Sequence, residues 1–160
     1  MLYLIPAPLH RLALRLAHRV RTRWRRLAKR KAAGVSVIGL DAQSRVFLVR
    51  HSYGSGRWSL PGGGLGYDED PHACARREMR EELGCEIEDL VLAAQLEETL
   101  HGAPHRAYVF TARFVGKPRL DGREVIDSGW FALDALPPDL VSFAAYRLKL
   151  AFPHCYSNES

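Results

Sequence analysis

The sequence predicts one α/β domain, in which helices pack against a mixed β-sheet, preceded by a basic amphipathic helix. Its 160 residues are enough for a single domain with a sizeable core. The composition, 47% hydrophobic and 26% charged, is typical of a globular protein. Strand and helix patterns follow in the order strands, helix, strands, helix, which predicts a mixed sheet covered by helices. The predicted boundary separates residues 1–32 from residues 33–160.

Residues 1–32 are strongly basic and carry an apolar stripe. Ten of the 23 Lys and Arg lie between Arg11 and Lys31, and no acidic residue precedes Asp41. Apolar side chains recur at steps of three and four residues, which predicts an amphipathic helix. They are Leu9, Leu12, Leu16, Val20, Trp24 and Leu27. Such a helix could pack on its own domain or on a second subunit in a homodimer, lie on an anionic membrane surface, or bind RNA phosphates.

The cysteine pattern and the hydropathy bear on location. Cys74, Cys85 and Cys155 show no CxxC spacing, so the sequence predicts neither disulfides nor a structural zinc site. Unpaired cysteines fit a reducing compartment, and we predict a cytoplasmic protein. No run of about 18 apolar residues is present, so no membrane-spanning helix is expected. A peripheral position at a membrane would depend on the basic helix.

The first half of the domain reads as a strand pair, a glycine-rich loop and a helix. "VSVIGL" and "RVFLVRH" predict two strands around a turn at "DAQS". Residues 52–70 contain too many glycines for regular structure, apart from a short strand at Trp58 to Leu60. Asp70 and Pro71 are typical of a helix start, and Gly84 is typical of a helix end. The helix is therefore predicted from Pro71 to Leu83.

The second half of the domain predicts three more strands and a last helix. Residues 86–98 and 106–115 read as long strands separated by a turn at residues 99–105. A short strand is expected within residues 125–133. The last helix is expected to begin within residues 137–140, at "PPDL", and to extend to about Phe152.

Three carboxylates converge on one side of the predicted helix. Glu78 lies three residues before Glu81 and four before Glu82, so the three side chains share a helix face. Like charges at this spacing destabilise a helix by a few tenths of a kcal/mol per pair, roughly. A hard divalent cation such as Mg²⁺ would reverse the sign, because it prefers oxygen ligands. The alternative is an ordinary solvent-facing helix with salt bridges to the neighbouring arginines.

The register of loop and helix resembles the signature of the Nudix hydrolase family. It runs Gly63, five residues, Glu69, seven residues, and then "REMREELGC" from Arg77 to Cys85. The resemblance covers about Ala33 to Phe152 and leaves the basic helix outside. It implies a Nudix-type α/β/α sandwich with a mixed sheet. It also implies divalent-metal-dependent hydrolysis of the diphosphate bond of a nucleoside diphosphate linked to another moiety.

The resemblance also implies roles for individual residues. Glu78, Glu81, Glu82 and the carbonyl of Gly62 would bind Mg²⁺, with Mn²⁺ as an alternative metal. Arg77 would orient a glutamate through a charge-assisted pair, and Glu69 would steady the loop. The catalytic residues would be Glu82, Glu81, Arg77 and Glu98. For the general base, the choice stays open between Glu82 and the pair Glu97 and Glu98 at the end of the following strand.

The substrate-binding residues are predicted less directly. The backbone of Gly63 can approach a ligand closely because no side chain intervenes. Arg50, with His51 and Arg57, could contact phosphates or be ordinary strand-edge charges. Trp58 could stack on a nucleobase or pack in the core, and His101 and His105 are expected at the surface. Nucleotide sugars, ADP-ribose, nucleoside triphosphates and dinucleoside polyphosphates all fit the signature.

A second class of function also fits the sequence. The domain could be catalytically idle and sense nucleotides, or bind RNA or a membrane. The presence of Arg77 and all three glutamates of the signature argues for the enzyme.

Overall fold

The computed structural model describes residues 32–66, 68–100, 102–120 and 124–155. The helix predicted within residues 1–32 lies outside the described residues. The elements are β1 (Ala32–Leu40), β2 (Val46–His51), β3 (Trp58–Ser59), α2 (Pro71–Leu83), β4 (Glu86–Leu100), β5 (Ala103–Val115), β6 (Val125–Phe131), α3 (Ser142–Ala151) and the short 3-10 helix η2 (Pro153–Cys155).

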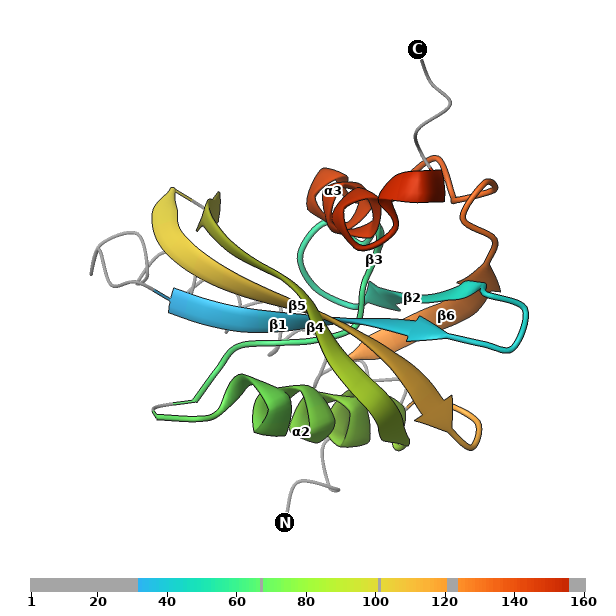
Figure 1. The fold of residues 1–160 in the computed structure, drawn as a ribbon, viewed down its shortest axis with the longest axis horizontal. Coiled ribbons are helices and arrows are strands. Elements are labelled where there is room, and N and C mark those ends of the chain that lie inside the picture. Colours follow the sequence, from blue (N-terminus) through green and yellow to red (C-terminus); the bar gives the residue numbers. More distant parts are fainter. Residues whose placement is uncertain (1–31, 67, 101, 121–123, 156–160) are drawn as a thin grey trace.

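The strands form one mixed sheet between two helices, as the sequence predicts. The strand order is β3-β2-β1-β5-β4, and β6 pairs with β2. β1 and β5 run parallel, whereas the other paired strands run antiparallel. In Figure 1, α2 lies below the sheet and α3 lies above it, so the domain has three layers.

Two hydrophobic cores fill the spaces between the layers. The core between α2 and the sheet contains Val35, Val37, Phe47, Val49, Cys74, Ala75, Met79, Leu83, Cys85, Ile87, Phe110, Ala112 and Val125. The core between α3 and the sheet contains Ile38, Val46, Leu48, Trp58, Leu60, Val109, Leu140, Val141, Ala144 and Leu148. Successive residues of β2 alternate between the two cores, because side chains along a strand point to opposite faces of the sheet.

The expected pair of β1 and β2 is open along most of its length. These two strands pair at Leu40 and Val46, beside the turn. The free edge of β1 is occupied instead by the glycine-rich loop. The amide of Val35 donates to the carbonyl of Gly63 at 2.8 Å, and the amide of Val37 donates to the carbonyl of Pro61 at 2.9 Å. The loop is thus held in the plane of the sheet, next to its central strand.

Two boundaries differ from the prediction. β4 and β5 extend to Leu100 and from Ala103, so the connection between them is shorter than the predicted turn. The last helix begins at Ser142 and not within residues 137–140. The reason is tertiary, since the amide of Val141 donates to the carbonyl of Trp58 at 2.9 Å and so holds this residue extended beside β3.

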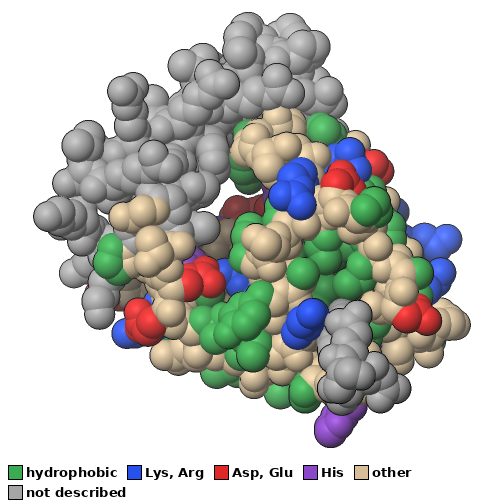
Figure 2. All heavy atoms as spheres, turned by 90° about the horizontal axis from the view of Figure 1, so that it is seen from above, with side chains coloured by type: hydrophobic (Ala, Val, Ile, Leu, Met, Phe, Trp, Pro, Cys, Tyr) green, Lys and Arg blue, Asp and Glu red, His purple; other side chains and the backbone are tan. Residues whose placement is uncertain are grey.

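The outer surface on the α3 side of the domain is partly apolar and partly charged. Figure 2, which shows this side, has hydrophobic patches with charged side chains between them. Large apolar side chains of α3 contribute to the exposed surface, namely Phe143, Tyr146 and Leu150. No helix among the described residues is long and apolar enough to cross a membrane.

The packing predicts a large stability effect at Phe110. This ring is fully buried in the core between α2 and the sheet, so Phe110→Ala should lower the free energy of unfolding by about 3–5 kcal/mol. Urea denaturation measures this loss. Val91→Ala is the control, because this side chain is 58% exposed, and it should change stability by about 0.5 kcal/mol or less. Equal effects of the two substitutions would contradict the described core.

Candidate active site

The caps of α2 fix which side chains face the loop. At the start, the carboxylate of Asp70 accepts from the amide of Ala73 at 3.0 Å, and Pro71 occupies the first turn. At the end, Gly84 adopts a left-handed conformation with φ 59°. Both helix boundaries agree with the prediction. The stripe Ala75, Met79 and Leu83 is buried, so the carboxylates emerge beside the core and next to the loop.

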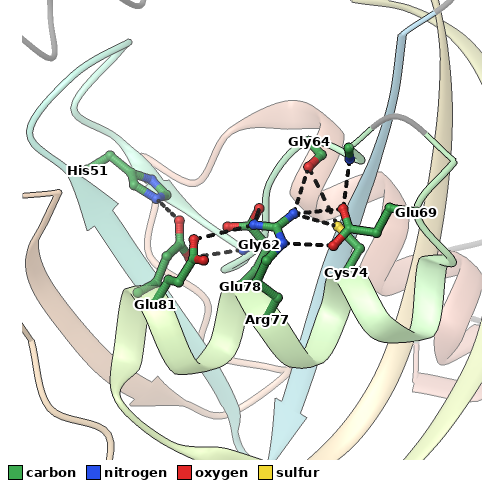
Figure 3. A network of polar contacts seen from close by, with 10 residues as sticks. His51, Gly62, Gly64, Glu69, Cys74, Arg77, Glu78 and Glu81 are labelled. Atoms are coloured by element: carbon green, nitrogen blue, oxygen red, sulfur yellow. Dashed lines mark hydrogen bonds and ion pairs between the residues drawn. The ribbon is translucent and has the colours of Figure 1, made fainter.

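Arg77 joins the loop to the helix. Its Nε and Nη2 donate to the two carboxylate oxygens of Glu69 at 2.7 and 2.9 Å. Nη2 also donates to the carbonyl of Gly64 at 3.1 Å. Nη1 donates to Glu78 at 2.8 Å and to Glu81 at 3.3 Å. Figure 3 shows the guanidinium between the loop residues and the carboxylates of α2. These contacts join Glu69 to the helix, and its role in steadying the loop stays a prediction.

The two-pronged pair shifts the ionisation of Glu69. Hydrogen bonds from Arg77, and then from the amide of Gly66, lower the pKa of Glu69 from 4.5 to about 2. The same pair raises the pKa of Arg77, although burial opposes this rise. Both groups are therefore charged at neutral pH, and their bond is a charge-assisted fork.

Glu82 is the most enclosed of the three helix carboxylates, with 4% of its side chain exposed. Its Oε2 accepts from the amide of Gly62 at 3.1 Å, and its Oε1 accepts from Nε2 of His51 at 3.0 Å. Burial lowers the pKa of His51, but the hydrogen bond and charge of Glu82, and the charges of Glu124 and Glu78, raise it overall. His51 therefore stands among carboxylates at the end of β2.

Glu78 is crowded by other negative charges. Burial, together with the charges of Glu82 and Glu81, raises the pKa of Glu78 to about 7, although Arg77 opposes this shift. Gly63 lies directly against this side chain. A Cβ added at Gly63 would stand 2.4 Å from the carboxyl carbon of Glu78. The close approach of loop and carboxylate thus requires glycine at this position.

The residues fit a hard divalent cation by their chemistry. In the described parts of the chain, no three His, Cys, Asp or Glu side chains form a ready-made metal-binding cluster. However, burial and then the charge of Glu82 raise the pKa of Glu78, and a cation between these carboxylates would favour their charged forms. Carboxylate oxygens are ligands that Mg²⁺ and Mn²⁺ prefer. The carbonyl of Gly62 as a further ligand stays a prediction.

Two of the predicted substrate-binding residues lie on the other face of the sheet. Arg50 precedes His51 on β2, so its side chain points toward α3, where it pairs with Asp139 at 3.0 Å. Its guanidinium also stacks 4.8 Å from the ring centre of Trp58. Trp58 is 8% exposed and packs edge-on against Phe131, which favours the core alternative for this ring. Of the residues predicted to contact substrate, Gly63 and His51 lie beside the carboxylates.

The two glutamates at the end of β4 have different surroundings. Glu97 is exposed and pairs with Arg106 at 2.6 Å. Glu98 accepts from Nδ1 of His105 at 3.1 Å and also pairs with Arg147 of α3. The expectation that His105 lies at the surface is wrong, because 7% of this residue is exposed. The structure therefore does not bring Glu98 together with the carboxylates of α2.

The sequence does not predict a place in the site for Glu124, and it predicts His51 only as a possible phosphate contact, together with Arg50 and Arg57. A signal was present, because His51 shares the alternation of Phe47 and Val49, which face α2. Glu124 lies beside it because the amide of Ser52 donates to the Glu124 carbonyl at 2.9 Å. This second contact joins segments far apart in sequence.

Comparisons with known proteins show what this chain is similar to. A family model described as "NUDIX domain" matches residues 30–151. An "ADP-ribose pyrophosphatase" of Mycobacterium tuberculosis is 30% identical over 107 residues, 62% of this chain and 52% of the relative. An "RNA pyrophosphohydrolase" of Rhodospirillum rubrum is 39% identical over 51 residues, 32% of this chain and 31% of the relative. The chain thus spans about half of the first relative and about a third of the second.

A solved structure has the same fold. It is the MutT NUDIX hydrolase from Burkholderia pseudomallei, with a TM-score of 0.69 and 28% sequence identity. The match covers 76% of this chain and 98% of that one. The layers of sheet and helices are therefore shared across the whole of that protein.

The Glu69–Arg77 pair predicts a pH-dependent contribution to stability. Because the pKa of Glu69 falls from 4.5 to about 2 on folding, its contribution is complete above pH 4.5 and disappears as the pH falls through about 2. Wild type should therefore melt at a higher temperature than Glu69→Gln at neutral pH, and the difference should shrink between pH 4.5 and 2. Thermal melts at several pH values measure this difference. A difference that stays constant down to pH 2 would contradict the pair.

Proposed function

The chain belongs to the NUDIX family, and from this premise we propose that it hydrolyses a diphosphate bond in a nucleotide-derived substrate. The observation that carries the proposal is the convergence around Arg77. One guanidinium holds the loop through Glu69 and Gly64, and on its other side it holds Glu78 and Glu81. This arrangement places a glycine-rich backbone, which can approach phosphates, directly beside crowded carboxylates.

We assign metal binding to the carboxylates of α2. Glu78 and Glu82 would hold Mg²⁺ or Mn²⁺, with the more exposed Glu81 completing the protein ligands. A divalent cation supplies charge stabilisation for phosphate oxygens and lowers the pKa of water. Arg77 contributes by holding Glu78 at a defined distance from the loop. Gly63 contributes by its lack of a side chain, since a methyl group there would displace the Glu78 carboxylate.

We assign proton transfer to Glu82 in preference to Glu98. Glu82 is buried beside the loop, whereas Glu98 is held by Arg147 and His105 on the α3 side. Nε2 of His51 donates to Oε1 of Glu82 at 3.0 Å, so this imidazole would orient the carboxylate that takes up the proton. Attack of the activated water on one phosphorus then breaks the P–O–P bridge.

The names of two relatives narrow the first substrates to test. One is an ADP-ribose pyrophosphatase and the other an RNA pyrophosphohydrolase. Both names describe a phosphoanhydride attached to a nucleoside. We propose a nucleoside diphosphate derivative of this kind, with ADP-ribose as the first candidate and RNA carrying a 5′-triphosphate as the second. The alternative of an idle, nucleotide-sensing fold is not favoured, because Arg77 and the three helix glutamates are all present.

Glu82→Gln should abolish most of the hydrolysis. The amide keeps the size of the side chain but removes the charge and the proton acceptor. We expect kcat/KM for the best substrate to fall roughly a hundredfold, which corresponds to about 2.7 kcal/mol of transition-state stabilisation. Release of nucleotide from ADP-ribose and from 5′-triphosphate RNA, measured with Mg²⁺ or with EDTA, tests this expectation.

Glu86→Gln is the matched control for that experiment. Glu86 follows α2, is exposed, and pairs with Arg80 at 2.6 Å. Its amide variant should hydrolyse the substrate like wild type. Hydrolysis that survives EDTA, or that Glu82→Gln leaves intact, would remove the proposed mechanism.

For residues 1–32 we propose attachment to an anionic surface. Ten of the chain's 23 Lys and Arg and an apolar stripe lie within this segment. A helix with these two features binds anionic lipid surfaces through charge and apolar burial together. Proximity to a membrane would then come from this segment, and the diphosphate chemistry from residues 33–160.

The proposal predicts salt-sensitive binding to vesicles. The full-length protein should co-sediment with vesicles that contain phosphatidylserine, and more weakly at high salt because salt screens the charges. Trp24→Glu should weaken this binding even at low salt, whereas Trp130→Phe serves as a control inside the domain. Absence of vesicle binding by wild type would favour packing of the segment on protein. Binding of single-stranded RNA in its place would favour the nucleic-acid alternative.

A further inference from the structure

A buried polar network on the α3 side of the sheet joins four elements. Nη1 of Arg147 in α3 donates to the hydroxyl of Ser36 in β1 at 2.6 Å, and Nη2 pairs with Oε1 of Glu98 in β4. The same oxygen of Glu98 accepts from Nδ1 of His105 in β5 at 3.1 Å. Ser36, His105 and Arg147 are 4%, 7% and 5% exposed. The Glu98 side chain is 22% exposed, so the network is buried at these three residues and reaches solvent at the carboxylate.

Stability alone is a weak explanation for such a network. Burial lowers the pKa of Arg147, and the charge and hydrogen bond of Glu98 oppose this shift. Burying a charged pair costs free energy that apolar residues of similar size would not require. Nε of Arg147 is also buried without a hydrogen-bond partner in the described part of the chain. An arrangement of this kind is best explained by what it holds in place.

The network touches β1 where that strand holds the glycine-rich loop. Ser36 stands between Val35 and Val37, whose amides hold the carbonyls of Gly63 and Pro61. Gly34 is the residue before Val35. A Cβ added at Gly34 would stand 3.1 Å from Nε2 of His105 and 2.9 Å from the Gly63 carbonyl oxygen. The network is thus bonded to β1 at Ser36, and His105 lies beside Gly34 with no room for a side chain between them.

The loop carries this constraint through the sheet to the carboxylates of α2. The amide of Gly62 donates to Glu82 at 3.1 Å, and Gly63 leaves no room for more than a hydrogen beside Glu78. A small displacement of β1 would therefore change how the loop backbone lies against Glu78 and Glu82. The two faces of the sheet are coupled by one strand and three consecutive loop residues.

We propose that Glu98, held by Arg147 and His105, is a positioning residue that fixes β1 and the glycine-rich loop against the metal-binding carboxylates Glu78 and Glu82. This inference rests on the proposed function and deepens it. It replaces the role of general base for Glu98 with a role that acts through β1. Substitution of residues that orient metal ligands without touching the metal typically lowers metal affinity or activity by about 10–100-fold.

Metal binding without substrate tests the proposal. Glu98→Gln keeps the size of the side chain and removes the charge that pairs with Arg147. Calorimetric titration of the folded variant with Mn²⁺ should show an affinity roughly 10–100-fold lower than that of wild type. Glu88→Gln is the matched control, because Glu88 lies on the same strand, is exposed and pairs with Arg113 at 3.3 Å. Its Mn²⁺ affinity should be unchanged.

Kinetics separate positioning from direct catalysis. If Glu98 positions the loop, the kcat of Glu98→Gln should recover toward the wild-type value as the Mn²⁺ concentration rises. A kcat that stays low at saturating Mn²⁺, together with an unchanged Mn²⁺ affinity, would mean that Glu98 acts at the reacting atoms. That result would overturn the proposal.

Ser36→Ala guards against a variant that fails to fold. It removes the hydroxyl next to Nη1 of Arg147 and leaves the Glu98–Arg147 pair intact. We expect weaker Mn²⁺ binding than in wild type, with a smaller effect than in Glu98→Gln. If wild type is active and both folded variants, Ser36→Ala and Glu98→Gln, bind Mn²⁺ with wild-type affinity, the positioning role of Glu98 is overturned and the proposed function stands. Wild type that binds Mn²⁺ but hydrolyses no substrate would instead remove the proposed function, and the affinity comparison would still decide the positioning role.

Discussion

The guanidinium of Arg77 is the contact on which the geometry of the site depends. A glycine-rich loop has many conformations, and an unpaired cluster of glutamates is electrostatically unfavourable at the end of a helix. Arg77 addresses both, because one planar group donates to Glu69 and Gly64 in the loop and to Glu78 and Glu81 in the helix. A lysine could not reproduce this fork, since its ammonium is a single point of charge.

The sheet separates two polar systems that share one strand. On the α2 side, Glu82 accepts from Gly62 and His51 beside the core of Met79 and Leu83. On the α3 side, Arg147 and Glu98 together connect three strands through polar contacts. β1 runs between them, with its backbone edge given to the loop and not to β2. The open strand pair is therefore the structural feature that lets the loop reach the centre of the sheet.

The local features of the site could be predicted because their causes are local. The bounds of α2 follow from Asp70, Pro71 and Gly84, whose preferences depend on their own backbone conformations. The convergence of Glu78, Glu81 and Glu82 follows from the period of the helix. In contrast, the start of α3 depends on the bond from Val141 to Trp58, which joins residues far apart in sequence. The burial of Trp58 and His105 has the same kind of cause, since partners from other elements cover them.

The sequence by itself determined the family signature and its charged groups, because spacing along one loop and one helix is enough to specify them. It also determined the order of the elements, because each strand and helix has its own local pattern of residues. Only the tertiary structure decided which face of the sheet each candidate occupies. Arg50 and His51 are neighbours in the chain, yet one points to Asp139 near α3 and the other to Glu82 in α2. The alternation of a strand assigns neighbours to opposite faces, but the helix that covers each face is set by packing. For the same reason Glu98 lies with His105 and Arg147 on the α3 side of the sheet, and not with the carboxylates on the α2 side.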